Sequence, residues 1–79
     1  MTLDQWMTST GMTPDQLGRE LGVSGEAVRR YRLGSRSPDA LIQEAIVRVT
    51  GGAVTVLDLH DTRLRFLKSQ NDPASPEAA

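Results

Sequence analysis

Four of the nine basic residues of this 79-residue chain fall in one short stretch, residues 22–38, with the sequence GVSGEAVRRYRLGSRSP. The same stretch holds a single acid, Glu26, although the whole chain has a formal charge of −1. An arginine guanidinium presents a planar fork of N–H donors that fits phosphate oxygens and the O6 and N7 atoms of guanine. The stretch therefore indicates a nucleic-acid surface, although a run such as RRYR is also typical of a solvated helix face.

Other kinds of chemistry have little support in the sequence. No cysteine is present, which excludes disulfides, thiolate nucleophiles and cysteine-based zinc sites. His60 is the only histidine, and no nucleophile, base and orienting group stand together in a recognisable motif. We therefore expect no enzyme, cofactor, metal or small-molecule effector. Because the chain starts without a basic leader and never runs through 18 apolar residues, we expect a cytoplasmic protein without a membrane partner.

The elements that must position the arginines are predicted to be helices. A threonine followed three residues later by glutamine predicts a capping box, and Thr2 with Gln5 and Thr13 with Gln16 both match this pattern. Ser24 stands two residues after a glycine that favours a helix end, so it is placed to cap a third helix. The first half of the chain therefore predicts three short helices.

The second half predicts two more helices and a tail. Ser37 as N-cap and Pro38 as first helical residue predict the fourth helix. The apolar residues of 55–68 fit a helix, which we favour, but leucine and phenylalanine alternating with arginine also fit a strand. Residues 69–79 are rich in proline, serine, alanine and acids and predict a disordered tail. We expect one all-α domain over 1–68, a compact bundle of about five helices.

The second and third predicted helices have the spacing of a helix-turn-helix, because a turn of about three residues separates them. Gly18 stands where two such helices cross closely, so only a small residue fits. Val28 and Tyr31 of the third helix are predicted to pack on Leu17 and Leu21 of the second. The buried positions therefore agree with what this geometry needs.

The stretch TPDQLGRELGVSGEAVRRYRLGSRSP resembles the Cro/cI-type (XRE-like) family of helix-turn-helix repressors, and the resemblance covers about residues 12–50. Gly18 replaces the more usual alanine of the family, a change expected to leave the packing intact, and Pro14 replaces a glutamine that contacts a phosphate in some members. The segment TGGAVTVLDLHD looks like the C-terminal part of small stand-alone members from phages and mobile elements. The resemblance implies a lambda-repressor-like fold and sequence-specific binding to double-stranded DNA.

The resemblance also implies which residues touch DNA, because in such proteins the third helix lies in the major groove with its first residues at the base edges. The implied base readers are Gly25, Glu26, Arg29 and Arg30, with the two arginines as the main ones. The implied phosphate contacts are Ser24, Arg32, Arg36 and Arg19. For Glu26 the alternative is an ion pair with one of the two arginines, and for Ser24 it is a purely structural cap.

The final segment is predicted to form a homodimer interface, because a core of this size takes up only some of its apolar residues. The candidates are Leu57, Leu59, Leu64, Phe66 and Leu67, and the alternative is that they close the core of the monomer. A two-fold dimer would place two reading helices about 34 Å apart and select an inverted repeat.

The expected function is that of a homodimeric transcriptional repressor that covers a promoter, often its own. Phage and mobile-element repressors, including anti-CRISPR-associated regulators, are the contexts that the resemblance allows, and activation through a polymerase contact stays open. The alternatives are the antitoxin of a toxin–antitoxin module and a protein-interaction module without DNA binding. Arginines along the predicted recognition surface favour DNA over protein.

Overall fold

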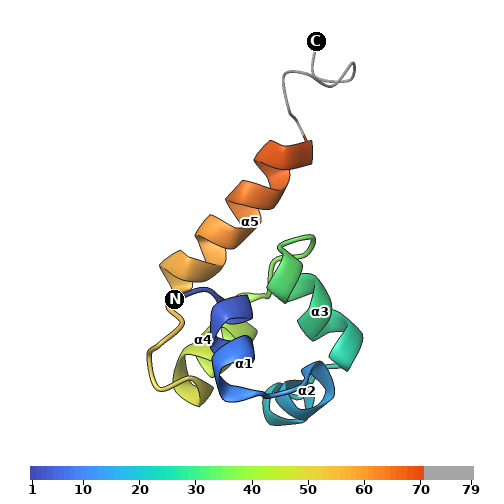
Figure 1. Ribbon diagram of the computed structural model, residues 1–79, viewed down its shortest axis with the longest axis vertical. Coiled ribbons are helices and arrows are strands. Elements are labelled where there is room, and N and C mark those ends of the chain that lie inside the picture. The colour runs from blue at the N-terminus through green and yellow to red at the C-terminus, as the bar shows by residue number, and fades with distance from the viewer. Residues whose placement is uncertain (71–79) are drawn as a thin grey trace.

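The computed structural model describes residues 1–70, and within this range the chain forms five helices and no strand. The helices are α1 (Leu3–Thr10), α2 (Pro14–Leu21), α3 (Gly25–Leu33), α4 (Ala40–Val49) and α5 (Val56–Gln70). Helices α1 to α4 gather into one body, and the C-terminal half of α5 extends away from it (Figure 1). The predicted all-helical bundle is therefore confirmed, and 55–68 is a helix rather than a strand.

The first three helices begin where the capping signals predict. Thr2 Oγ1 accepts from the backbone N–H of Gln5 at 3.1 Å, and Gln5 Oε1 accepts from the N–H of Thr2 at 2.9 Å. Thr13 and Gln16 form the same reciprocal pair at 3.2 and 2.9 Å. Ser24 Oγ accepts from Ala27 N–H at 3.1 Å, so Ser24 is the N-cap of α3.

The start of α4 and the end of α5 differ from the prediction. The N-cap of α4 is Asp39 rather than Ser37, and Asp39 Oδ1 accepts from the N–H of Ile42 at 3.0 Å. Pro38 lies before the helix, where it is buried and its carbonyl accepts from a glutamine side chain. Helix α5 includes Ser69 and Gln70, two residues of the segment whose composition predicts a disordered tail. The rest of that segment, 71–79, lies outside the described residues.

Within residues 1–70 the core is built from ten buried apolar residues, contributed by the five helices and by the turn before α5. They are Leu3, Met7, Leu17, Leu21, Val28, Tyr31, Ala45, Ile46, Val54 and Leu59. The predicted packing of Val28 and Tyr31 with Leu17 and Leu21 is part of this cluster. Burial of these side chains is the main source of stability, since each large apolar side chain contributes about 1.5–3 kcal/mol when buried.

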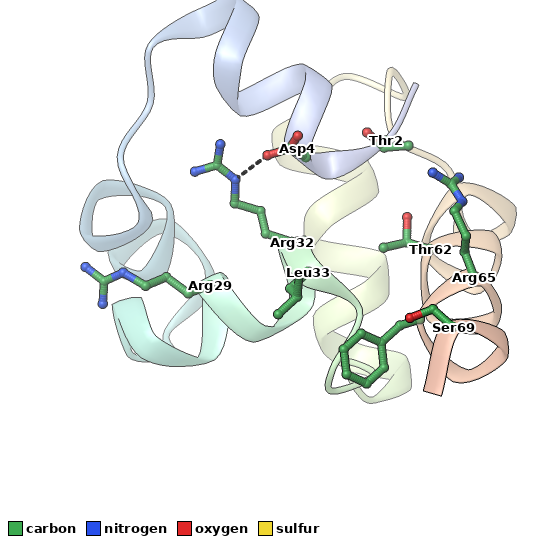
Figure 2. Close-up of a pocket in the computed structure, with 9 residues that line it drawn as sticks. Thr2, Asp4, Arg29, Arg32, Leu33, Thr62, Arg65 and Ser69 are labelled. Atoms are coloured by element: carbon green, nitrogen blue, oxygen red, sulfur yellow. Dashed lines mark hydrogen bonds and ion pairs between the residues drawn. The ribbon is translucent and has the colours of Figure 1, made fainter. Parts of the chain in front are cut away.

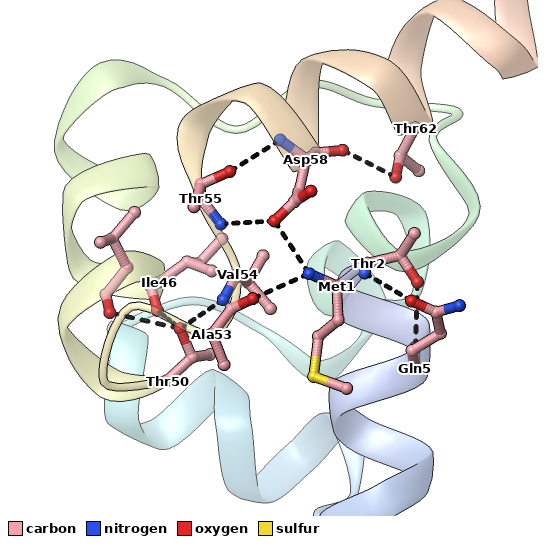
Figure 3. A network of polar contacts seen from close by, with 11 residues as sticks. Met1, Thr2, Gln5, Ile46, Thr50, Ala53, Val54, Thr55, Asp58 and Thr62 are labelled. Carbon is pink, nitrogen blue, oxygen red and sulfur yellow. Dashed lines mark hydrogen bonds and ion pairs between the residues drawn. The ribbon is translucent and has the colours of Figure 1, made fainter.

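A polar network ties the N-terminus to the start of α5 (Figure 3). The Met1 amino group donates to the carbonyl of Ala53 at 2.9 Å and to Asp58 Oδ2 at 3.1 Å. Asp58 Oδ2 also accepts from the N–H of Thr55 at 2.9 Å, and Thr55 Oγ1 accepts from Asp58 N–H at 3.1 Å. The Thr55 N–H first, and then the terminal amine, hold the pKa of Asp58 below its ordinary value.

The end of α3 lies against the middle of α5. Gly34, with φ +91°, terminates α3, and a Cβ added there would lie 2.6 Å from the carbonyl oxygen of Thr62 and 3.0 Å from Phe66 Cβ. The Arg63 guanidinium of α5 donates to the carbonyls of Gly34 and Ser35 at 2.9 and 3.0 Å, which satisfies backbone acceptors at this helix end. The contact therefore requires a glycine for both its backbone conformation and its close approach.

Gly34→Ala is expected to lower the free energy of unfolding by about 2–4 kcal/mol, because strain and overlap with α5 add together. Gly11→Ala is the matched control, since Gly11 also has a positive φ, +73°, but nothing lies within 4 Å of the added Cβ. For Gly11→Ala we expect a loss of about 1 kcal/mol from strain alone. Urea denaturation followed by circular dichroism measures both, and equal losses would contradict the close packing of α3 on α5.

The lowered pKa of Asp58 makes its contribution to stability dependent on pH. A carboxyl whose folded pKa is depressed stabilises the fold above its ordinary pKa of about 3.9, and this stabilisation is lost as pH falls through the folded pKa. Asp58→Asn is therefore expected to lower the urea midpoint at neutral pH, and its deficit should shrink on acidification below about pH 4. Asp61→Asn, at an exposed position of the same helix, is the control. A deficit of Asp58→Asn that stays constant with pH would refute the role of this carboxylate.

Candidate functional site

Helix α3 is fixed on α2 by a tight turn. Gly22 ends α2 with φ +76°, and the N–H of Val23 donates to the carbonyl of Gly18 at 2.9 Å. A Cβ added at Gly18 would lie 2.6 Å from the carbonyl oxygen of Val23, so the turn approaches α2 more closely than an alanine would permit. The expectation that position 18 needs a small residue is confirmed, and in this chain the residue must be glycine unless the turn shifts.

The exposed face of α3 carries three charged residues that pair with one another. Glu26, Arg29 and Arg30 are all more than half exposed at their side chains. Glu26 lies 3.5 Å from Arg29 Nη1 and 3.5 Å from Arg30 Nε, so the predicted alternative of an ion pair is present for both arginines. Such long, exposed pairs are worth about 0–1 kcal/mol, so they leave the guanidinium groups available to a partner.

The remaining predicted base contact, Gly25, is half-buried at the start of α3. A Cβ added there would meet the carboxylate of Asp15 on α2. The side chain of Asp15 thus occupies the space beside the first turn of α3. Gly25 allows this close packing but offers no side chain of its own to a partner.

The four predicted phosphate contacts fall into two groups. Ser24 is the cap of α3, and Arg32 is bound within the protein, since its Nε donates to Asp4 Oδ1 of α1 at 2.8 Å and its side chain is only 29% exposed. Arg19 on α2 and Arg36 in the turn after α3 are both exposed. Arg32 therefore joins α3 to α1. A phosphate would have to compete with the Asp4 carboxylate for the Arg32 guanidinium, which counts against the predicted phosphate contact.

A groove of about 520 Å³ opens beside α3, between the start of α1 and the outer half of α5 (Figure 2). Its lining residues are Thr2, Asp4, Arg29, Arg32, Leu33, Thr62, Arg65, Phe66 and Ser69. In the sequence Arg65 stands out only as part of an alternating pattern, which predicts no role for it. No local signal distinguishes Arg65 from Arg63, because only the packing of α5 on α3 turns one into the groove and the other onto Gly34.

The predicted dimer residues separate into three environments. Leu57 is 65% exposed, and Leu64 and Leu67 are each 39% exposed, all on the outer face of α5. Phe66 is half-buried and lines the groove. Leu59 is only 5% exposed and lies in the core, so it closes the monomer and has no surface to give to a second copy. For Leu59 the predicted interface role is therefore corrected to the alternative.

Within the described residues, no group of three or more potential metal-ligating side chains comes together. In the same part of the chain, none of the helices combines the length and the apolarity needed to cross a membrane. Comparison with protein-family models, with curated proteins and with solved structures finds no match for this chain.

Proposed function

We propose that the protein is a sequence-specific DNA-binding transcriptional regulator, in which α2 and α3 act as a helix-turn-helix and α3 enters the major groove. The observation that carries this proposal is the exposed face of α3, where Glu26, Arg29 and Arg30 project from a helix whose angle to α2 is fixed by the contact at Gly18. A helix is about 10–12 Å wide with its side chains, which suits a major groove about 12 Å wide.

Electrostatics support one docking orientation. The side chains of Arg19, Arg30 and Arg36 are exposed on α2, on α3 and in the turn after α3. The exposed acids Asp39 and Glu44 lie at the start of α4 and on it, and they repel DNA from that face. The chain thereby combines a formal charge of −1 with a basic reading surface. Contacts to phosphates, including one from Ser24 at the start of α3, supply the salt-dependent part of the affinity. They act together with the contacts to bases.

A homodimer completes the proposal, since one helix reads only a few base pairs and binds weakly at physiological salt. Leu57, Leu64 and Leu67 form an apolar face along the outer side of α5, joined by Val56 at 50% exposure. Two copies that pair through this face under two-fold symmetry would place two α3 helices on an inverted repeat. Occupation of a promoter by this dimer excludes polymerase, which makes the protein a repressor in the cytoplasm.

Selection from a pool of random DNA duplexes is expected to enrich an inverted repeat. Arg30→Ala is expected to reduce the preference for that sequence over a scrambled duplex by about 5- to 150-fold for each half of the dimer, equivalent to about 1–3 kcal/mol for each arginine–base pair that the variant cannot form. Arg48→Ala, an exposed arginine at the end of α4, is the matched control and should leave the preference unchanged. Failure to enrich any sequence, or an Arg30→Ala variant with full preference, would refute the proposed function.

The wild-type protein is expected to sediment as a dimer at micromolar concentration or on DNA, and Leu64→Glu as a monomer, because a carboxylate in the paired face would be desolvated. Leu41→Glu is the matched control, since Leu41 is an exposed leucine, 77% accessible, on α4. Analytical ultracentrifugation with circular dichroism distinguishes dissociation from unfolding. A wild-type protein that stays monomeric in solution and on DNA would contradict the α5 interface.

A further inference from the structure

The groove beside α3 is strongly basic for a chain with a formal charge of −1. Its lining includes the three arginines Arg29, Arg32 and Arg65 and a single acid, Asp4, which gives a local formal charge of +2. The arginines come from two helices, α3 and α5, and the acid comes from α1 (Figure 2). The surroundings of the groove therefore favour an anion.

Two of the three guanidinium groups have donors to offer. Arg32 is held by Asp4 at 2.8 Å, whereas Arg29 has only the exposed 3.5 Å pair with Glu26. Arg65 is exposed and makes no ion pair or side-chain hydrogen bond with any residue from 1 to 70. Because a guanidinium binds phosphate oxygens through two parallel N–H donors, Arg29 and Arg65 are suited to a phosphate.

The groove also contains an apolar surface that a simple anion would leave uncovered. Leu33, the last residue of α3, is 65% exposed in the groove, and Phe66 of α5 is half-buried beside it. The backbone of nucleic acid alternates anionic phosphates with deoxyribose rings, whose carbon atoms suit such a surface. Arginines on opposite sides and apolar side chains in the lining therefore match a stretch of sugar-phosphate backbone better than free phosphate.

Arg29 and its neighbour in sequence, Arg30, lie on different sides of α3. Successive residues of an α-helix point about 100° apart, and Arg29 lines the groove whereas Arg30 does not. A helix that fills the major groove has the DNA backbone along its flanks, so a side chain on the flank meets phosphates and one on the leading face meets bases. The two arginines thus have different partners.

We propose that the groove between α1, α3 and α5 binds a stretch of the DNA backbone, with Arg29 and Arg65, on opposite sides of the groove, contacting different phosphates. This assignment rests on the proposed function and refines it, because it moves Arg29 from base readout to the backbone and adds α5 to the DNA surface. Arg32 acts as a positioning residue, which holds the start of α1 against α3 through Asp4. Arg30 remains the reader of bases.

Fluorescence anisotropy on the selected duplex and on a scrambled duplex, from about 50 to 200 mM salt, tests this assignment. Arg29→Ala should weaken binding to the selected duplex and to the scrambled duplex by the same factor, and so should Arg65→Ala. Each substitution should reduce the slope of log K against log salt by about two, because it occurs twice in a dimer. Arg65→Lys keeps the charge and should retain the slope. Arg48→Ala, outside the groove, is the matched control, and circular dichroism checks that each variant is folded.

The two readouts separate failure of the groove from failure of the function. If the wild-type protein prefers the selected duplex but Arg65→Ala leaves the slope unchanged, the groove assignment is overturned and the proposed function stands. An Arg29→Ala variant that relaxes base preference as Arg30→Ala does would also overturn it. If the wild type shows no preference, the proposed function fails, and if it binds neither duplex, both fail. Saturable binding of inorganic phosphate, seen by NMR at Arg65, with an unchanged DNA slope would assign the groove to a free anion instead.

Discussion

The position of α3 depends on two backbone contacts that exclude side-chain atoms, one at each end of the helix. At its start, the turn approaches Gly18 of α2 so closely that an added Cβ would lie 2.6 Å from a carbonyl oxygen. At its end, a Cβ added to Gly34 would lie 2.6 Å from the carbonyl oxygen of Thr62 on α5. Arg63 donates two hydrogen bonds across this contact. A helix held at both ends in this way presents its exposed face at a fixed angle to the rest of the fold.

The five arginines on α3 and α5 show why the number of basic residues is a poor measure of a binding surface. Arg32 and Arg63 direct their donors to acceptors of the protein itself, an aspartate of α1 and two carbonyls at the end of α3. Both contacts fix α3, which carries Arg29 and Arg30, against its neighbours. Arg29, Arg30 and Arg65 keep their donors exposed, so the structural arginines hold the available ones in place.

Local signals in the sequence are sufficient to predict the helices, because capping depends on residues three positions apart. Thr2 and Thr13 show this directly, and the one displaced start, at Asp39, occurs where three consecutive residues compete to begin the same helix. Burial along the last helix is harder to predict. Leu57 and Leu59 are chemically alike, and only the angle at which α5 crosses the core decides that one is exposed and the other buried.

In the candidate site, too, some features follow from local signals in the sequence and others only from tertiary packing. The exposed positions of Glu26 and Arg30 follow from helical periodicity once Val28 and Tyr31 are placed in the core. The pairing of Arg32 with Asp4 joins residues 28 positions apart, and the groove joins α1, α3 and α5. Such arrangements depend on tertiary packing and carry no local pattern, so the sequence alone points to a basic helix but not to the groove beside it.

The bond between the Met1 amine and Asp58 also bears on how the chain assembles. It joins residues 57 positions apart, whereas the contacts between α2 and α3 join neighbours in sequence. Contacts between distant residues carry the larger entropic cost of closing a long loop, so they form late relative to local ones. We expect α3 to be paired with α2 before the start of α5 is anchored, so the anchoring of α5 is the last step in forming the domain.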